Sequence, residues 1–330
     1  DNNGKTSSFS NYIALGGGGG ASKDDYTYAS SLVIDESVGS GGGGVSSINR
    51  KLSKGGYGTF MQGNNGGNGE SILNGNSGGG GGANSIGQDG ITGGNGGIGI
   101  NLSNLFNENV GDLGWFAGGG AGCLYIDQSN ITDSSNITDS KGGKGGGGDA
   151  ALTNDTVGTN GLLHTGGGGG GGSGNALGGN GGSGVVIIKE HLSTVEIPLF
   201  KYFLNYNKPI SKYFIYDPKN DNEFGQTEYN INIEKSAYFD ILIIGGGGSG
   251  NNITEYTSNI IITSNIIVTS NLDNSNLTSN IVITSNIEYL SNIYEYGGGG
   301  GGLIFLENQY IENNEYSIKF GKGGVYLNGI

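Results

Sequence analysis

Uninterrupted glycine is the feature that most constrains what this chain can fold into. The longest run, Gly166–Gly172, leads through further glycine-rich sequence into the short apolar stretch Val185–Ile188. The opposite order occurs where Tyr238–Ile244 enters Gly245–Gly248. An interior glycine costs about 0.5–1 kcal/mol relative to alanine in a helix or strand. Runs of this length therefore exclude ordinary helices and sheets.

A bundle of polyproline-II helices is one structure that only glycine can build. Such a helix has three residues per turn and no internal hydrogen bonds, so its backbone groups need outside partners. A seven-residue run spans roughly 22 Å in this conformation. The alternative is a flexible glycine linker. Apolar residues at the ends of the runs favour the packed bundle, since Tyr12–Leu15 precedes Gly16–Gly20 and Trp115–Ala117 precedes Gly118–Gly120.

Composition and charge exclude several classes of protein. Glycine makes up 74 of 330 residues without a Gly-X-Y period, which excludes collagen. The net charge of −14 argues against nucleic-acid and anionic-membrane partners. The single cysteine, Cys123, excludes an intrachain disulfide. No apolar run is long enough to predict a membrane span.

The chain divides where its composition changes. Residues 1–191 carry most of the glycine runs, and residues 192–225 lose glycine and hold all three prolines, which indicates a connector. Residues 226–330 bring strand patterns back. Thr227–Ile233 and Glu315–Phe320 alternate with period two, and Ala237–Ile244 predicts a second, more deeply buried strand.

A hexapeptide repeat interrupts the last part, at 251–296. Its unit is Thr-Ser-Asn-Ile-Ile-x, and an even period keeps the same faces along a strand. The repeat breaks at Leu272–Asn276, a cluster of turn formers, which predicts a projecting β-hairpin. A β-solenoid turn is the alternative. Together these patterns predict a mainly β fold with essentially no α-helix, in which short-stranded β-sandwich elements pack with a polyglycine-II bundle.

Four stretches carry a resemblance to a known family. They are Phe239–Gly248, Tyr316–Gly324 (YSIKFGKGG), Lys5–Gly20 (KTSSFSNYIALGGGGG) and Gly181–Lys189 (GGSGVVIIK). In these stretches the chain resembles the glycine-rich domain of giant-virus and phage fibre or surface proteins, which is related to the glycine-rich extracellular region of anaplastic lymphoma kinase. The resemblance implies sandwich strands beside a polyglycine-II bundle, and a role in fibres or attachment.

The order of these stretches suggests an assembly. The opening elements of the family pattern lie in 226–330 and the later ones in 1–191, so the chain resembles the rear part of one domain followed by the front part of the next. We therefore expect identical subunits or repeats to complete one another head-to-tail as a filament on a virion or in an extracellular fibre. The expected assembly residues are Phe9, Tyr12, Ile13, Gly166, Gly169, Val185, Ile187, Ile241, Ile243, Tyr316, Ile318 and Phe320.

Two other functions stay open. The first is an adhesin of a viral or phage fibre that binds a host-surface glycan or receptor through the loops at 127–140 and 251–296. The turn at Leu272–Asn276 lacks the aromatic and charged anchors that binding surfaces favour, so a scaffold is preferred. The second is ice binding through the Thr257, Asn259, Thr263 and Asn265 array.

No pattern predicts an enzyme, a cofactor or a metal. The GxGxxG matches open no predicted helix, and His164, His191 and Cys123 lack the spacing of a catalytic set. Asp127, Asp133 and Asp139 could offer oxygen ligands to Ca²⁺, but without EF-hand spacing. Candidate glycosylation sites are Asn130, Asn136, Asn252 and Asn276.

Overall fold

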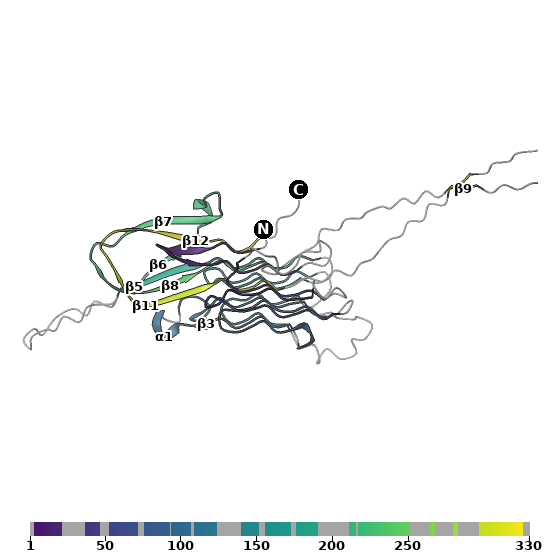
Figure 1. Cartoon of the computed structure of the whole chain (residues 1–330), viewed down its shortest axis with the longest axis horizontal. Coiled ribbons are helices and arrows are strands. Elements are labelled where there is room, and N and C mark those ends of the chain that lie inside the picture. The colour runs from purple at the N-terminus through teal and green to yellow at the C-terminus, as the bar shows by residue number, and fades with distance from the viewer. Residues whose placement is uncertain are drawn as a thin grey trace, which may run out of the picture.

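The structure is a computed structural model, and it has a β-sandwich at one end and a glycine-rich bundle beyond it (Figure 1). Each extended segment that crosses the bundle is called a pass. It describes residues 3–21, 37–46, 53–71, 76–92, 94–106, 109–123, 140–151, 156–172, 176–190, 211–215, 217–250, 265–267, 280–282 and 297–325.

The first sheet of the sandwich joins the two ends of the sequence. Its strand order is β2-β1-β12-β7, and every neighbouring pair is antiparallel. The strands are β1 (Ser7–Phe9), β2 (Tyr12–Ala14), β7 (Gln226–Asn232) and β12 (Glu315–Gly321). Ser8 pairs with Lys319, so the N-terminal hairpin completes a sheet begun by the C-terminal strands of the same chain.

The second sheet is also antiparallel, with the order β11-β8-β5-β6. Its strands are β5 (Val185–Glu190), β6 (Ser211–Ile215), β8 (Ala237–Ile244) and β11 (Leu303–Ile311). A β-bulge interrupts the β8–β11 pairing between Leu306 and Gln309, where Asn308 has a φ of 53° and its N–H donates to Asp240 Oδ1 (3.0 Å).

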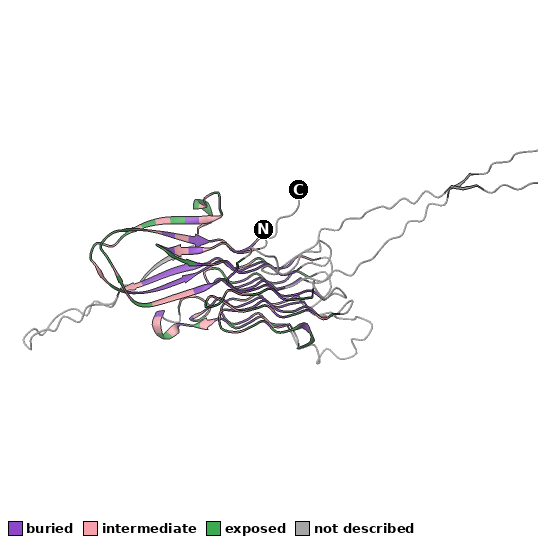
Figure 2. Ribbon diagram, viewed as in Figure 1, coloured by how far each residue is buried: buried purple, intermediate pink, exposed green. Residues whose placement is uncertain are grey.

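Two apolar clusters explain the sequence patterns of the strands. One lies between the sheets and includes Phe9, Ile241, Ile318 and Phe320. The other lies on the opposite face of the second sheet, where Val185, Ile187, Leu242 and Ile244 pack against a small layer. That layer comprises β3 (Ile100–Asn101), α1 (Ser103–Phe106) and β4 (Trp115–Phe116). The centre of the second sheet is therefore buried on both faces. This is why β5 and β8 contain the unbroken apolar stretches Val185–Ile188 and Ile241–Ile244, while β7 and β12 alternate (Figure 2).

The glycine passes have threefold helical character. In the run Gly78–Gly82, the N–H groups of Gly78 and Gly81 donate to the pass at 41–44, each at 2.9 Å. Those of residues 79 and 82 donate to the pass at 85–88, and that of residue 80 donates to Gly120, also at 2.9 Å. Donors three residues apart thus point the same way, as a polyproline-II helix requires. This confirms that the glycine runs are packed helices and not linkers.

The run Gly297–Gly302 lies at the centre of this packing. Its N–H groups donate in turn to three passes, and its carbonyls accept from three others. The six neighbours are the passes at 166–169, 15–18, 81, 40–43, 120 and 245–248. Runs from both halves of the sequence therefore enclose it, and the bundle, like the sandwich, draws on the whole chain.

The predicted fold class is confirmed: the described residues are mainly β, and their one α-helix is the four-residue α1. Short 3₁₀ turns occur at Gly90–Thr92 (η1) and Pro218–Asn220 (η4). The predicted hairpin insertion is visible where β9 (Asn265–Ile267) pairs antiparallel with β10 (Asn280–Val282). The rest of 251–296 lies outside the described residues.

The two predicted parts of the chain, 1–191 and 226–330, contribute strands to the same sandwich. Residues 1–190 and 226–325 pair with each other through β1–β12 and β5–β8, so one chain contains both halves of a single sandwich. Part of the predicted connector is also structural, because β6 at 211–215 pairs with β5. The order of the family's elements along the sequence does not determine whether the two parts pair within one chain or between two chains.

Candidate functional site: the far end of the glycine bundle

The bundle is close-packed at the level of backbone atoms. A Cβ atom on Gly169 would overlap the Gly179 carbonyl, and one on Gly120 would overlap the Gly169 carbonyl. At Gly166 the backbone itself demands glycine, since its φ is +70° and the Ile244 side chain lies against it. Large side chains are therefore excluded from the packed runs, and the buried residues other than glycine, such as Ser40 and Ala121, are small.

Many of the points where the chain leaves or re-enters the bundle, called its interruptions, lie at the end away from the sandwich. Ala21 N–H donates to Gly43 O (3.0 Å), and Gly43 N–H donates to Gly297 O (3.0 Å). Ser77 N–H donates likewise to Cys123 O (2.9 Å). These contacts place side by side the points where the chain leaves and re-enters the bundle. The sequence segments that begin or end beside them include 22–36, 47–52, 72–75, 124–139 and 251–296.

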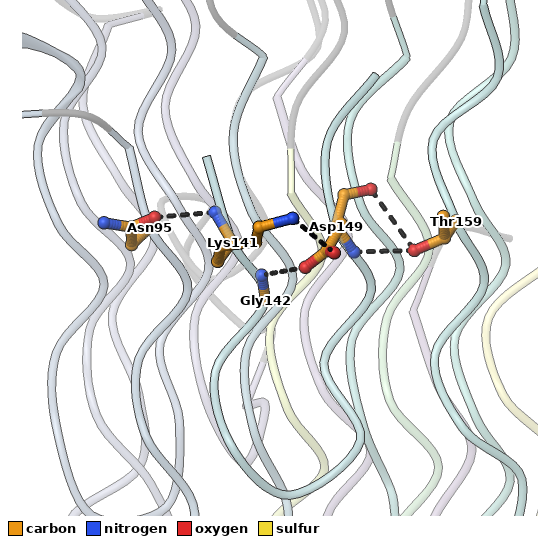
Figure 3. A network of polar contacts seen from close by, with 5 residues as sticks. All are labelled: Asn95, Lys141, Gly142, Asp149 and Thr159. Carbon is orange, nitrogen blue, oxygen red and sulfur yellow. Dashed lines mark hydrogen bonds and ion pairs between the residues drawn. The ribbon is translucent and has the colours of Figure 1, made fainter. Parts of the chain in front are cut away.

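Polar side chains complete the hydrogen bonding on the side of the bundle. Asp149 Oδ1 accepts from Gly142 N (2.8 Å), while its Oδ2 lies 3.2 Å from Lys141 Nζ (Figure 3). Lys141 N in turn donates to Asn95 Oδ1 (2.6 Å), and Asp149 N donates to Thr159 Oγ1 (2.6 Å). Each of these side-chain oxygens accepts a backbone N–H bond that, inside the bundle, a carbonyl of a neighbouring pass would accept. At this part of its side the backbone donors of the bundle are therefore satisfied by side chains.

Most of the predicted assembly residues lie inside the chain. Those in the core between the sheets or packed against it are Phe9, Ile241, Ile243, Tyr316, Ile318 and Phe320. Val185 and Ile187 belong to the second cluster, and Gly166 and Gly169 to the bundle. Tyr12 and Ile13 differ, since they are 37% and 50% exposed on the edge strand β2. Ten of the twelve residues thus make contacts within this chain, and their role between subunits stays a prediction.

Gln62 is a structural residue that sequence reasoning missed. Its side-chain amide accepts from Leu15 N (2.8 Å) and donates to Ile13 O (3.2 Å), as a neighbouring strand would. Its backbone carbonyl accepts from Leu303 N (3.0 Å). Gln62 thereby covers the edge of β2 and ties it to β11. A lone glutamine in a loop gives no sequence signal for this role.

His164 makes a local contact with Ser183. His164 N donates to Ser183 Oγ (3.0 Å), and the same oxygen lies 3.2 Å from His164 Nδ1. Burial lowers the pKa of His164, because the charged imidazolium would lose hydration. Ser183 is only 1% exposed, so its hydroxyl is buried and the pair holds the turn before Gly166–Gly172.

Several candidates fall outside the described residues. These are the sequons at Asn130, Asn136, Asn252 and Asn276, the aspartates Asp127, Asp133 and Asp139, His191, and most of the Thr/Asn array. Across the part of the chain that the structure describes, no group of three or more His, Cys, Asp or Glu side chains is placed to hold a metal ion. Within the same residues, no helix has the length and apolar character of a membrane span.

Comparison with known proteins identifies the family. The glycine-rich domain family matches residues 1–190, more than half of the sequence, and the chain belongs to that family. No curated protein and no solved structure gave a match. The narrower kinship with giant-virus and phage fibre proteins, and with anaplastic lymphoma kinase, stays a prediction.

Proposed function

We propose that this chain is an attachment module, in which a rigid glycine bundle is the scaffold and recognition is carried by sequence segments that leave it at its far end. The observation that carries the proposal is the convergence of the interruptions at that end, around Ala21, Gly43, Cys123 and Gly297. A bundle whose buried positions hold glycine and a few small residues leaves mainly its surface and ends for recognition. Binding residues commonly lie on loops that a rigid scaffold positions.

The partner class is a glycan or protein on a cell surface, and the location is a virion surface or extracellular fibre. The segments 124–139 and 251–296 are rich in Asn, Ser and Thr, which can exchange hydrogen bonds with such partners. The net charge of −14 favours partners other than nucleic acid or anionic membranes.

Replacing the two segments tests the attachment role. In one variant, short Gly-Ser linkers replace 124–139 and 251–296; in a matched control, the exposed residues Phe60 and Met61 at the sandwich end are changed to serine. Binding to a panel of cells and to a glycan array is then measured, together with Tm. We expect the first variant to keep its Tm and lose binding, and the control to keep both. Unchanged binding of the segment-replaced variant would contradict the proposal.

A fibre subunit is the second candidate. The β1–β12 and β5–β8 pairings join parts far apart in the sequence, so the same pairings could form between copies by exchange of halves. A disulfide between Ser8→Cys and Lys319→Cys, in a Cys123→Ala background, tests this. Oxidation in dilute solution should give a monomeric crosslinked chain for the attachment module, and a ladder of linked chains for the exchanged fibre.

A further inference from the structure

The outer edge of β7 is a border of the first sheet. β7 is the end strand in the order β2-β1-β12-β7, and it lies at the margin of the sandwich (Figure 1). Ile233 N–H donates to Asn314 O (2.9 Å), so the backbone groups of Ile233 and Ile231 point toward β12. In an antiparallel pair the residues between them direct their backbone groups to the opposite side. The N–H and C=O groups of Asn230 and Asn232 therefore point away from β12.

The first part of this edge is covered and the second part is open. Asp221 forms a β-bridge with Thr227, so the turn before β7 covers the strand as far as Thr227. Farther along, no group in the described part of the chain bonds to the outward backbone groups of Asn230 or Asn232. β7 contains no proline or lysine, and its pairing with β12 has no bulge, although such features commonly protect an exposed edge. The opposite edge of the same sheet differs, because Gln62 covers β2 there.

The inner face of the open stretch carries apolar side chains. Tyr229, Ile231 and Ile233 are partly buried and pack against the core between the sheets. The centre of the Tyr229 ring lies 5.6 Å from that of the Phe320 ring. Since β7 is the last strand of the sheet, a strand added at its edge would bury these apolar side chains further, which is favourable.

A second copy of β7 is complementary to this edge. When two β7 strands pair antiparallel with Ile231 on a two-fold axis, Asn230 of each copy lies opposite Asn232 of the other. The outward groups of each such pair exchange both N–H···O=C bonds. On the inner face Ile231 then meets Ile231 of the second copy, and Tyr229 meets Ile233. Apolar and aromatic cross-strand pairs of this kind stabilise a sheet.

We propose that this chain forms a two-fold symmetric dimer through the open edge of β7. An interface in which both copies use the same surface closes at two copies. Each chain keeps its own β1–β12 and β5–β8 pairings, so this dimer differs from a fibre formed by exchange of halves. The contact joins the sandwiches and does not depend on the attachment role of the far end.

Sedimentation equilibrium of the whole chain over roughly 1–500 μM tests the dimer. We expect a monomer–dimer equilibrium in which the mass stops at twice that of the chain. A monomer at the highest concentration, or growth beyond two copies, would overturn the inference.

Two variants at Asn230 test the backbone contact. Asn230→Pro removes an N–H that points away from β12, so the sheet keeps its own hydrogen bonds, and an edge strand tolerates proline at such a position. Dimerisation should weaken at least about tenfold, while the Tm of the monomer stays unchanged. Asn230→Ala keeps the N–H and is the matched control, which should dimerise within about threefold of wild type. Dimerisation of the proline variant at wild-type strength would exclude this edge.

Glu234 tests the register without altering the strand. In the proposed pairing Glu234 of one copy lies opposite Glu228 of the other, where like charges repel, although Lys319 Nζ lies 3.7 Å from Glu228 Oε1. Glu234 is exposed and follows the end of β7, so Glu234→Lys should tighten the dimer about threefold or more. Glu307→Lys makes the same change of charge at an exposed position on β11 and should have no effect. Weaker or unchanged dimerisation of Glu234→Lys would contradict the register.

The dimer and the attachment role are tested separately. The variant in which linkers replace 124–139 and 251–296 should still dimerise, because β7 and its neighbours are intact. Asn230→Pro should keep its binding to single glycans on the array. Failure of one proposal is therefore distinguishable from failure of the other.

Discussion

The sandwich and the glycine bundle are stabilised in opposite ways. In the sandwich, side chains such as Phe320 and Ile241 are fully buried between the sheets, and hydrophobic burial stabilises the fold. In the bundle, the buried positions carry almost no side chain. The passes are held by backbone hydrogen bonds, as from Gly298 N to Gly169 O (2.7 Å) and from Gly299 N to Gly18 O (2.7 Å).

The difference determines what each region tolerates. A side-chain core can adapt to a change of volume through new rotamers and small shifts. A backbone core has no such freedom, because an added methyl group meets a carbonyl fixed by its own hydrogen bonds. The bundle should therefore be more sensitive to gain of a methyl group than the sandwich is to loss of one.

The largest expected effect is a side chain added at Gly169. Its Cβ would overlap the Gly179 carbonyl oxygen, so Gly169→Ala should reduce the free energy of unfolding by about 3 kcal/mol or more, and Gly169→Val should prevent folding. Gly225→Asn is the control, because its φ of +69° suits asparagine and the nearest atom lies 3.7 Å away. Thermal and urea unfolding measure both. A Gly169→Val protein that melts within a few degrees of wild type would exclude the packed bundle.

Truncation in the sandwich should come next. Phe320→Ala removes a fully buried ring between the sheets and should cost about 3–5 kcal/mol. Ile243→Val removes one methylene from the same cluster and should cost only about 0.5–1.5 kcal/mol. Urea unfolding gives both values. If Ile243→Val destabilised the chain more than Gly169→Ala, the contrast between the two regions would be wrong.

Loss of a polar group on the side of the bundle should have a smaller effect. Asp149→Ala removes the acceptor of Gly142 N and should cost about 1 kcal/mol. Asp149→Asn keeps an oxygen acceptor and loses only the exposed ion pair with Lys141, so it should be nearly neutral. Equal losses from the two variants would indicate that charge, and not the hydrogen bond, is what stabilises this surface.

The smallest effect concerns pH. The pKa of His164 is lowered from 6.5 by burial, so below pH 6.5 the unfolded chain takes up a proton that the folded chain resists. The free energy of unfolding should therefore fall as the pH drops below 6.5, and level off below the folded pKa. His164→Gln should remove this contribution. An increase in stability on acidification through this range would contradict the assigned burial.

Much of the fold could be predicted because the two regions leave different patterns. Continuous glycine allows few structures, and the apolar residues of Val185–Ile188 and Ala237–Ile244 indicated strands, the second of them deeply buried. The alternation along β7 and β12 indicated half-buried strands. These patterns are local, so they predict secondary structure even when the partners of each segment are unknown.

The rest depends on contacts between distant residues. Whether β1 meets β12 of its own chain is decided by geometry that no local pattern encodes. The role of Gln62, which joins β2 to the start of β11, likewise depends on residues far apart in sequence. The gathering of the interruptions at one end follows from the direction of each pass, which the glycine runs themselves do not specify.

Hydrogen exchange of the glycine amides tests the central claim most directly. The account predicts that the amides of Gly297–Gly302, enclosed by six neighbouring passes, exchange as slowly as those of β5 and β8 and become exposed only in global unfolding. Exchange within seconds along Gly297–Gly302, with β5 and β8 still protected, would mean that the glycine runs are mobile linkers attached to a sandwich, and would contradict the account.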